Sequence, residues 1–107
     1  MHNTNTVFEI ASDKEFHETL KNFPLVIVDF YADWCPPCKA VAPKYAAMAS
    51  DYPNVRFCKV NIDDVQEVAG EFDIKAIPAF VLSQNGSEVN RFTGSDASKL
   101  AQLLESV

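Results

Sequence analysis

The sequence has 107 residues, of which 48% are hydrophobic, and this is enough for one globular domain with a single core over residues 1–107. Fifteen acidic and nine basic residues give a net charge of −6, so we expect no binding to nucleic acid or to anionic membranes through a basic surface. No stretch reaches the roughly twenty apolar residues that span a membrane, and residues 1–6 lack the apolar core of a signal peptide. These features favour a soluble, cytoplasmic protein.

The first part of the chain predicts a strand and then an amphipathic helix. Residues 6–10 are a short strand candidate. Ser12 and Glu15 form a capping-box pattern, in which Ser12 accepts from the Glu15 amide while the Glu15 side chain reaches back. Phe16 and Leu20 then place apolar side chains on one helical face.

Residues 25–31 are apolar apart from Asp29, which is typical of a central strand covered on both faces. Two interpretations of Asp29 are open. It is either a solvated or ion-paired carboxylate at a strand end, or a buried carboxylate with a raised pKa that accepts a proton. Its position, just before two cysteines, favours the proton acceptor.

The stretch Trp34-Cys35-Pro36-Pro37-Cys38-Lys39 carries the chemistry. Apolar residues recur at helical spacing after it, so we expect a helix that begins at Cys35. The unpaired amides and the dipole at that helix end favour a thiolate and lower the pKa of Cys35. Cys38 lies one turn further on, within reach of a disulfide. This pattern predicts disulfide exchange, in which one sulfur attacks a partner and the other resolves the mixed disulfide.

The cysteine pair has two further interpretations. A purely structural disulfide here would close a very short loop and would remove little entropy from the unfolded chain. Half of a zinc site is also possible, but neither His2 nor His17 is near the cysteines in sequence, so we expect no metal site. The odd total of three cysteines argues against a secreted disulfide framework.

Residues 55–62 predict the next strand, so strand, helix and strand form a right-handed parallel crossover. Cys58 lies in the middle of this strand and is typical of a small buried hydrophobe rather than a working thiol. Lys59 has two interpretations, because it is either an inward-pointing charge partner for Asp29 or an ordinary solvated lysine.

A short helix is expected next, with Asp63 or Asp64 as its cap. Asp73 stands where a residue in the left-handed conformation often ends a helix.

The end of the chain predicts a hairpin and a last helix. Residues 79–82 and 88–92 flank the dipeptide Asn85-Gly86, which is the signal of an antiparallel hairpin. Ser95 or Asp96 is expected to cap the final helix. The order is therefore βαβαβαββα, and we expect a three-layer α/β/α domain of the α/β class.

Over essentially its whole length the sequence resembles the thioredoxin family. The resemblance rests on Asp29 to Cys35, Pro37-Cys38-Lys39, Pro43, Lys59 to Asp63, Ala76-Ile77-Pro78, Asn85-Gly86 and Gly94. It implies the thioredoxin fold, with a mixed central five-stranded sheet. It also implies a dithiol–disulfide oxidoreductase that reduces disulfides in target proteins.

The resemblance implies a role for each residue of the site. Cys35 is the attacking thiolate and Cys38 the resolving thiol. Asp29 accepts a proton from Cys38, with the assistance of Lys59. Trp34 belongs to a flat apolar rim around the exposed sulfur.

The resemblance also implies a face that binds substrate. The peptide bond between Ile77 and Pro78 is expected to be cis, and the backbone before this proline pairs with an extended stretch of the partner. The expected binding residues are Trp34, Pro36, Pro37, Ile77, Pro78 and Gly94.

The family's redox system sets the expected cofactors and partners. No cofactor is bound, because the redox group is the disulfide itself. Electrons come from NADPH through thioredoxin reductase, and targets are disulfide-containing proteins such as peroxiredoxins or ribonucleotide reductase. We expect a monomer.

Pro36 departs from the family pattern, which usually has Gly-Pro between the cysteines. Because proline has no N–H, only the Cys38 amide remains as a near donor, so we expect Cys35 to be less acidified than in a Gly-Pro relative. Pro-Pro also resembles tryparedoxin. Two competing functions are a thiol oxidase or isomerase, and a non-redox binding subunit that uses the face around Trp34 and Pro78.

Overall fold

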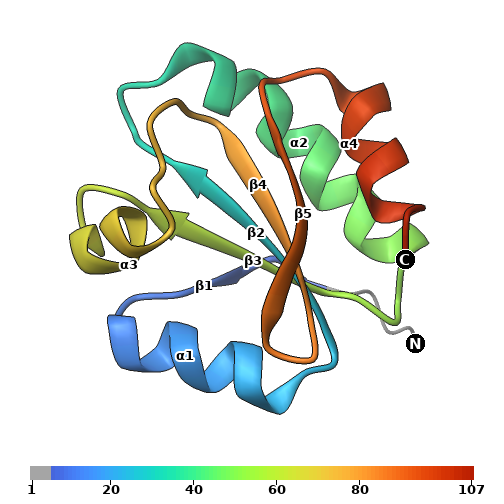
Figure 1. Cartoon of the computed structure of the whole chain (residues 1–107). Helices are drawn as coiled ribbons and strands as arrows, with labels where there is room; N and C mark the ends of the chain where they lie inside the picture. The colour runs from blue at the N-terminus through green and yellow to red at the C-terminus, as the bar shows by residue number, and fades with distance from the viewer. Residues whose placement is uncertain (1–5) are drawn as a thin grey trace.

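In the computed structural model, which describes residues 6–107, strand β2 lies at the centre of a mixed five-stranded sheet (Figure 1). The sheet order is β1-β3-β2-β4-β5, with β2 parallel to β3 and antiparallel to β4. The elements are β1 (Phe8–Glu9), α1 (Asp13–Asn22), β2 (Leu25–Tyr31), α2 (Pro36–Asp51), β3 (Arg56–Asn61), α3 (Gln66–Glu71), β4 (Ala79–Gln84), β5 (Ser87–Thr93) and α4 (Ala97–Leu104). The expected order of elements is confirmed.

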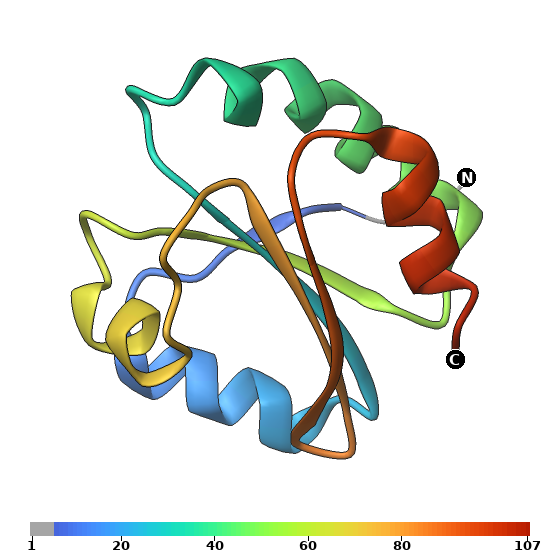
Figure 2. The same cartoon turned by 45° about the horizontal axis from the view of Figure 1, so that its top comes forward.

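The helices form two layers, with α1 and α3 on one face of the sheet and α2 and α4 on the other (Figure 2). Successive side chains of a strand point to opposite faces. Val28 and Phe30 therefore pack with Phe16 of α1, whereas Ile27 packs with Tyr45 of α2. The expected α/β/α layering is confirmed. Within the described residues, no helix is both long enough and apolar enough to cross a membrane.

This alternation decides where the polar residues of the central strands point. Asp29 lies two residues after Ile27 on β2 and so faces α2, and Lys59 is its register partner on β3. Val28 is paired with Cys58, and both belong to the core under α1. The strand pairing therefore delivers one carboxylate and one ammonium group to the helix that carries the cysteines.

The first helix begins as the sequence predicts. The Ser12 hydroxyl accepts from the Glu15 amide at 3.1 Å, and the Glu15 carboxylate accepts from the Ala11 amide at 2.7 Å. Phe16 and Leu20 are buried on its inner face. The strand before it is shorter than residues 6–10, because only two residues pair with β3.

The expected cap of the short helix is wrong. Helix α3 begins at Gln66 after Val65, which makes no side-chain capping bond. The reason lies in Asn61 at the end of β3, whose side-chain oxygen accepts from the Asp63 amide at 2.9 Å and whose carbonyl accepts from the Val65 amide at 3.0 Å. These bonds fold residues 62–64 into a turn, so neither Asp63 nor Asp64 caps the helix.

The expected turns are confirmed. Asp73 has a φ of 55° where α3 ends, and Asn85 and Gly86 have φ values of 54° and 88° in the β4–β5 hairpin. Positive φ at both central residues gives the turn a twist that matches the flanking strands. Asp96, rather than Ser95, caps α4, because its carboxylate accepts from two amides of the first turn.

Candidate active site

The two cysteines lie where the chain passes from β2 to α2 (Figure 1). Cys35 is the N-cap of α2, Pro36 and Pro37 occupy its first two positions, and a disulfide joins Cys35 to Cys38 with Cα atoms 5.3 Å apart. The Cys38 amide donates to the Cys35 sulfur at 3.2 Å. The two prolines have no N–H, so this is the amide that the first turn offers to the sulfur.

The expected exposure of the Cys35 sulfur is wrong for this disulfide form. Cys35 and Cys38 are each only 3% exposed. The pair forms a small apolar cluster with Ala32, against which Ile77 packs. The physical reason is that the chain before β4 folds over the start of α2 and covers the disulfide.

The cis peptide bond between Ile77 and Pro78 is confirmed, and it lies beside the disulfide. The Cys35 sulfur is 3.9 Å from the Ile77 carbonyl oxygen, a contact rather than a hydrogen bond because a disulfide sulfur carries no hydrogen. The Pro78 carbonyl accepts from the Gly94 amide at 2.9 Å. The fold therefore brings three segments that are distant in the sequence to one place.

The expected binding residues differ in exposure. Trp34 is 65% exposed, and its indole N–H donates to the Asp63 carboxylate at 2.9 Å. Pro36 and Pro37 are also exposed. The other three lie deeper, with Ile77 and Gly94 half-buried and Pro78 buried.

Asp29 is the buried carboxylate that the sequence favours. Its side chain is 3% exposed, and one of its oxygens has no hydrogen-bond partner among the described residues. Burial raises the pKa of Asp29 from 3.8 to about 7, since the charged form loses its hydration. Lys59 lowers this pKa and Glu9 raises it.

Asp29 does not touch the thiols directly but shares a cavity with one of them. The cavity measures about 140 Å³, and its polar lining includes Asp29, Cys38 and Lys59. This volume is large enough for several water molecules. A water-mediated path between the carboxyl group and the Cys38 sulfur is therefore sterically open.

Lys59 is both partly solvated and close to Asp29, so both expected roles apply in part. Its side chain is 42% exposed, yet it borders the cavity beside Asp29. Its ammonium group lies 3.8 Å from the Glu9 carboxylate and 5.6 Å from the centre of the Tyr31 ring. The Tyr31 hydroxyl donates to the same Glu9 oxygen at 2.7 Å. The Lys59 ammonium group thus forms an ion pair with Glu9 and also acts electrostatically on Asp29.

Sequence reasoning missed Glu9 as part of this site. Glu9 is distant from the cysteines in the sequence, and only the pairing of β1 with β3 places it beside Lys59. Asp63 was expected only as a helix cap, and its role as the acceptor for Trp34 depends on the pairing of β2 with β3. No local signal in the sequence points to either contact.

The third cysteine has no part in this chemistry. Cys58 is fully buried in the core under α1, and burial raises its pKa to about 12. The expectation of a small buried hydrophobe is confirmed. A larger cavity of about 390 Å³ lies at the opposite end of the sheet, around Phe8 and Arg56, and none of its lining residues is a cysteine or an acid.

Comparisons with known proteins agree with this geometry. The family model for thioredoxin matches residues 7–106. Thioredoxin 1 of Plasmodium falciparum is 41% identical over 96 residues, which cover 90% of this chain and 92% of that protein. Thioredoxin-2 of Pyricularia oryzae is 38% identical over 92% of this chain, although the matched region spans only 58% of that protein.

Solved structures of thioredoxins superpose closely on the fold. A structure of Plasmodium falciparum thioredoxin has a TM-score of 0.92 at 40% identity and covers 94% of this chain and 98% of its own. The crystal structure of the Malassezia sympodialis thioredoxin has a TM-score of 0.93 at 30% identity, with 99% and 94% covered. The chain therefore belongs to the thioredoxin family, and the disulfide between Cys35 and Cys38 makes it a dithiol–disulfide oxidoreductase.

Proposed function

We propose that this protein reduces disulfide bonds in other proteins. The observation that carries the proposal is the Cys35–Cys38 disulfide at the start of α2, with Asp29 buried behind it and open to Cys38 through a cavity. A buried carboxyl group with a pKa near neutral is suited to taking up the proton of a resolving thiol.

The reaction begins from the reduced pair. The Cys35 thiolate attacks one sulfur of the target disulfide, so a mixed disulfide forms and the other target sulfur leaves as a thiolate. The hydrogen bond from the Cys38 amide, 3.2 Å from the Cys35 sulfur in the disulfide form, supports the negative charge on that sulfur.

The second step returns the pair to the form described above. Cys38 loses its proton to Asp29 through water in the shared cavity, and the resulting thiolate attacks the Cys35 sulfur. The Cys35–Cys38 disulfide forms, and the second target sulfur leaves. Two electrons have passed to the target. Lys59 assists by stabilising the Asp29 carboxylate, as its effect on the Asp29 pKa supports.

Targets bind over the face around the disulfide. Trp34 offers an exposed apolar surface there, and we infer that the backbone at Ile77, which lies beside the Cys35 sulfur, pairs with an extended stretch of the target. Cys35 is nearly covered in the disulfide form, so we expect the side chains that pack over it to shift when a target docks. The binding face comprises Trp34, Pro36, Pro37, Ile77, Pro78 and Gly94.

Further parts of the proposal follow from the family. Electrons reach the disulfide from NADPH through thioredoxin reductase. Peroxiredoxins and ribonucleotide reductase are candidate targets. The protein acts as a monomer in the cytoplasm, where a reducing environment suits a reductant.

Turnover of a protein disulfide with NADPH and thioredoxin reductase tests the proposal. The wild-type protein should cycle, whereas Cys38→Ser should stall as a covalent mixed disulfide between Cys35 and the target. Cys35→Ser is the matched control and should form no adduct. If Cys38→Ser turns over at the wild-type rate, the resolving role of Cys38 is wrong.

Two measurements separate this function from the competing ones. The reduction potential of the pair distinguishes a reductant from a thiol oxidase or isomerase, which would hold a more positive potential. A partner complex that survives both Cys35→Ser and Cys38→Ser unchanged would instead indicate a binding subunit that transfers no electrons.

A further inference from the structure

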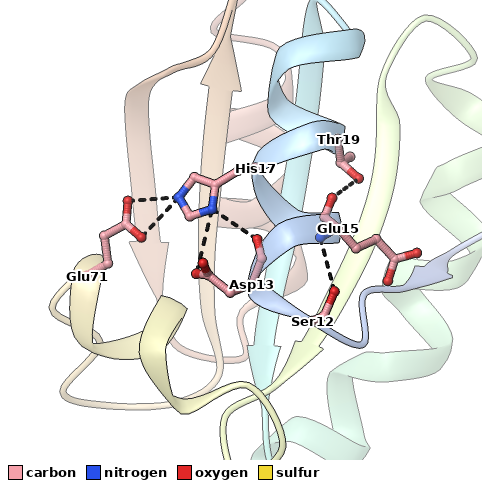
Figure 3. A network of polar contacts seen from close by, with 6 residues as sticks. All are labelled: Ser12, Asp13, Glu15, His17, Thr19 and Glu71. Atoms are coloured by element: carbon pink, nitrogen blue, oxygen red, sulfur yellow. Dashed lines mark hydrogen bonds and ion pairs between the residues drawn. The ribbon is translucent and has the colours of Figure 1, made fainter.

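Three side chains that metals commonly bind meet on the surface between α1 and α3 (Figure 3). Asp13 and His17 lie one turn apart on α1, and Glu71 is the last residue of α3. One ligand atom from each residue lies within 4.8 Å of the other two. We expected no metal site from the sequence, because neither histidine is near the cysteines. The fold, however, joins His17 to a residue 54 positions away.

The His17 ring has oxygen atoms next to both of its nitrogens. Nδ1 is 2.9 Å from the Asp13 carbonyl oxygen, and Nε2 is 3.1 Å from each oxygen of the Glu71 carboxylate. A neutral imidazole carries only one N–H. When that hydrogen is on Nδ1 and donates to the carbonyl, the Nε2 lone pair points toward the Glu71 carboxylate. This arrangement suits a cation at Nε2.

The spacing of His17 and Glu71 matches that of two ligands on one metal ion. The Asp13 carboxylate lies 3.6 Å from Nδ1, on the other side of the ring, so this half-exposed side chain must rotate to reach an ion at Nε2. Ligands of a tetrahedral zinc ion, each about 2.0–2.1 Å from the metal, are about 3.3 Å apart. The separation of 3.1 Å between Nε2 of His17 and the Glu71 oxygens is close to this value. The bond from Nδ1 to the Asp13 carbonyl is also the contact that usually orients a metal-binding histidine through its other nitrogen.

The two helices that supply these ligands are held by the core. Phe16, beside His17, is fully buried, and its ring packs against Phe72 just after α3, with centroids 5.2 Å apart. The His17 and Phe16 rings make a T-shaped contact, with centroids 5.5 Å apart. The ligand side chains themselves are 43% to 49% exposed. The backbone is therefore fixed, while an ion can enter from solvent.

We propose that Asp13, His17 and Glu71 form a binding site for a divalent transition-metal ion, with water in the remaining positions. One imidazole and two carboxylates favour Zn²⁺ over Mg²⁺, because Mg²⁺ prefers an all-oxygen shell. A bound ion would cross-link α1 to α3. This site is separate from the cysteine pair and does not depend on the proposed reductase function.

The test is calorimetric titration of zinc chloride into the oxidised protein, in which Cys35 and Cys38 are not free to bind the metal. The wild-type protein should bind one ion, and His17→Ala should weaken binding by about tenfold or more. Glu71→Gln keeps the size of the side chain and should also weaken binding. Magnesium chloride should produce no saturable heat under the same conditions.

Two matched controls sharpen the result. His2→Ala removes the other histidine, and Glu67→Gln neutralises an exposed acid elsewhere on α3. Both should bind zinc like the wild type, and the His17 ring signals in a proton NMR spectrum should shift on zinc addition. A wild-type protein that binds no zinc would show that the cluster is only an ion pair. Undiminished affinity in His17→Ala would equally overturn the proposal.

Discussion

Replacing Asp29 with asparagine should remove a pH-dependent loss in the free energy of unfolding. Asp29 is 3% exposed, and burial raises its pKa from 3.8 to about 7. The folded protein therefore holds this proton more tightly than the unfolded chain does. Consequently, stability falls as the pH rises from about 4 to about 7, and the full cost is present above that range. Asparagine has nearly the same shape and does not ionise.

The size of the effect follows from the two pKa values. The difference between 3.8 and about 7, at about 1.4 kcal/mol per pH unit, corresponds to about 4 kcal/mol. This is an upper value, because the neighbouring cavity lets water reach the carboxylate. It is nevertheless a large fraction of the stability of a small domain.

Urea unfolding of the oxidised protein at about pH 5 and about pH 8.5 measures this cost. The quantity of interest is the wild-type free energy of unfolding minus that of Asp29→Asn. This difference should become up to about 3 kcal/mol more unfavourable to the wild type at the higher pH, because part of the cost is already present at about pH 5. Asp64→Asn, at an exposed position, is the control and should not change the pH profile. An Asp29→Asn variant with the wild-type pH profile would refute the buried, proton-binding carboxyl group.

The remaining predictions concern the thiols and the core. Pro36→Gly should lower the pKa of Cys35, measured by thiolate absorbance, because it restores an amide N–H at the start of α2. An unchanged or higher pKa would refute the effect of the proline. Tyr45→Phe should cost about 1–2 kcal/mol in urea unfolding, since the buried hydroxyl lies 2.7 Å from the Cys58 carbonyl and 3.1 Å from the Ile27 carbonyl and its hydrogen bond would be lost. Equal stability would contradict this. Cys58 should react with a thiol reagent only after unfolding, because it is fully buried and its pKa is about 12. Rapid labelling of the native protein would show that the strand opens.

Local patterns in the sequence predicted the structure correctly where an interaction spans only a few residues. The capping box at Ser12 and Glu15, the turn at Asn85 and Gly86, and the placement of Cys35 at a helix start are all confirmed. Each depends on contacts within about one helical turn or one hairpin, so the residues that make it are adjacent in the sequence.

Local patterns failed where a residue outside the motif competes. Asp63 and Asp64 are good capping residues, but the side chain and carbonyl of Asn61 bind the amides of the turn and move the start of α3. The family resemblance implied an exposed Cys35 sulfur, but Ile77 packs against the disulfide. In both cases a residue outside the local motif decided the outcome.

The sequence by itself determined the fold class, the position of the disulfide and the candidate proton acceptor, because hydrophobic periodicity and residue spacing encode them directly. Only the tertiary structure decided which polar groups meet. The pairing of β1 with β3 sets Glu9 beside Lys59, and the packing of α1 on α3 sets His17 beside Glu71. These contacts depend on strand register and helix packing. Both are properties of the whole chain and cannot be predicted from any short stretch of it.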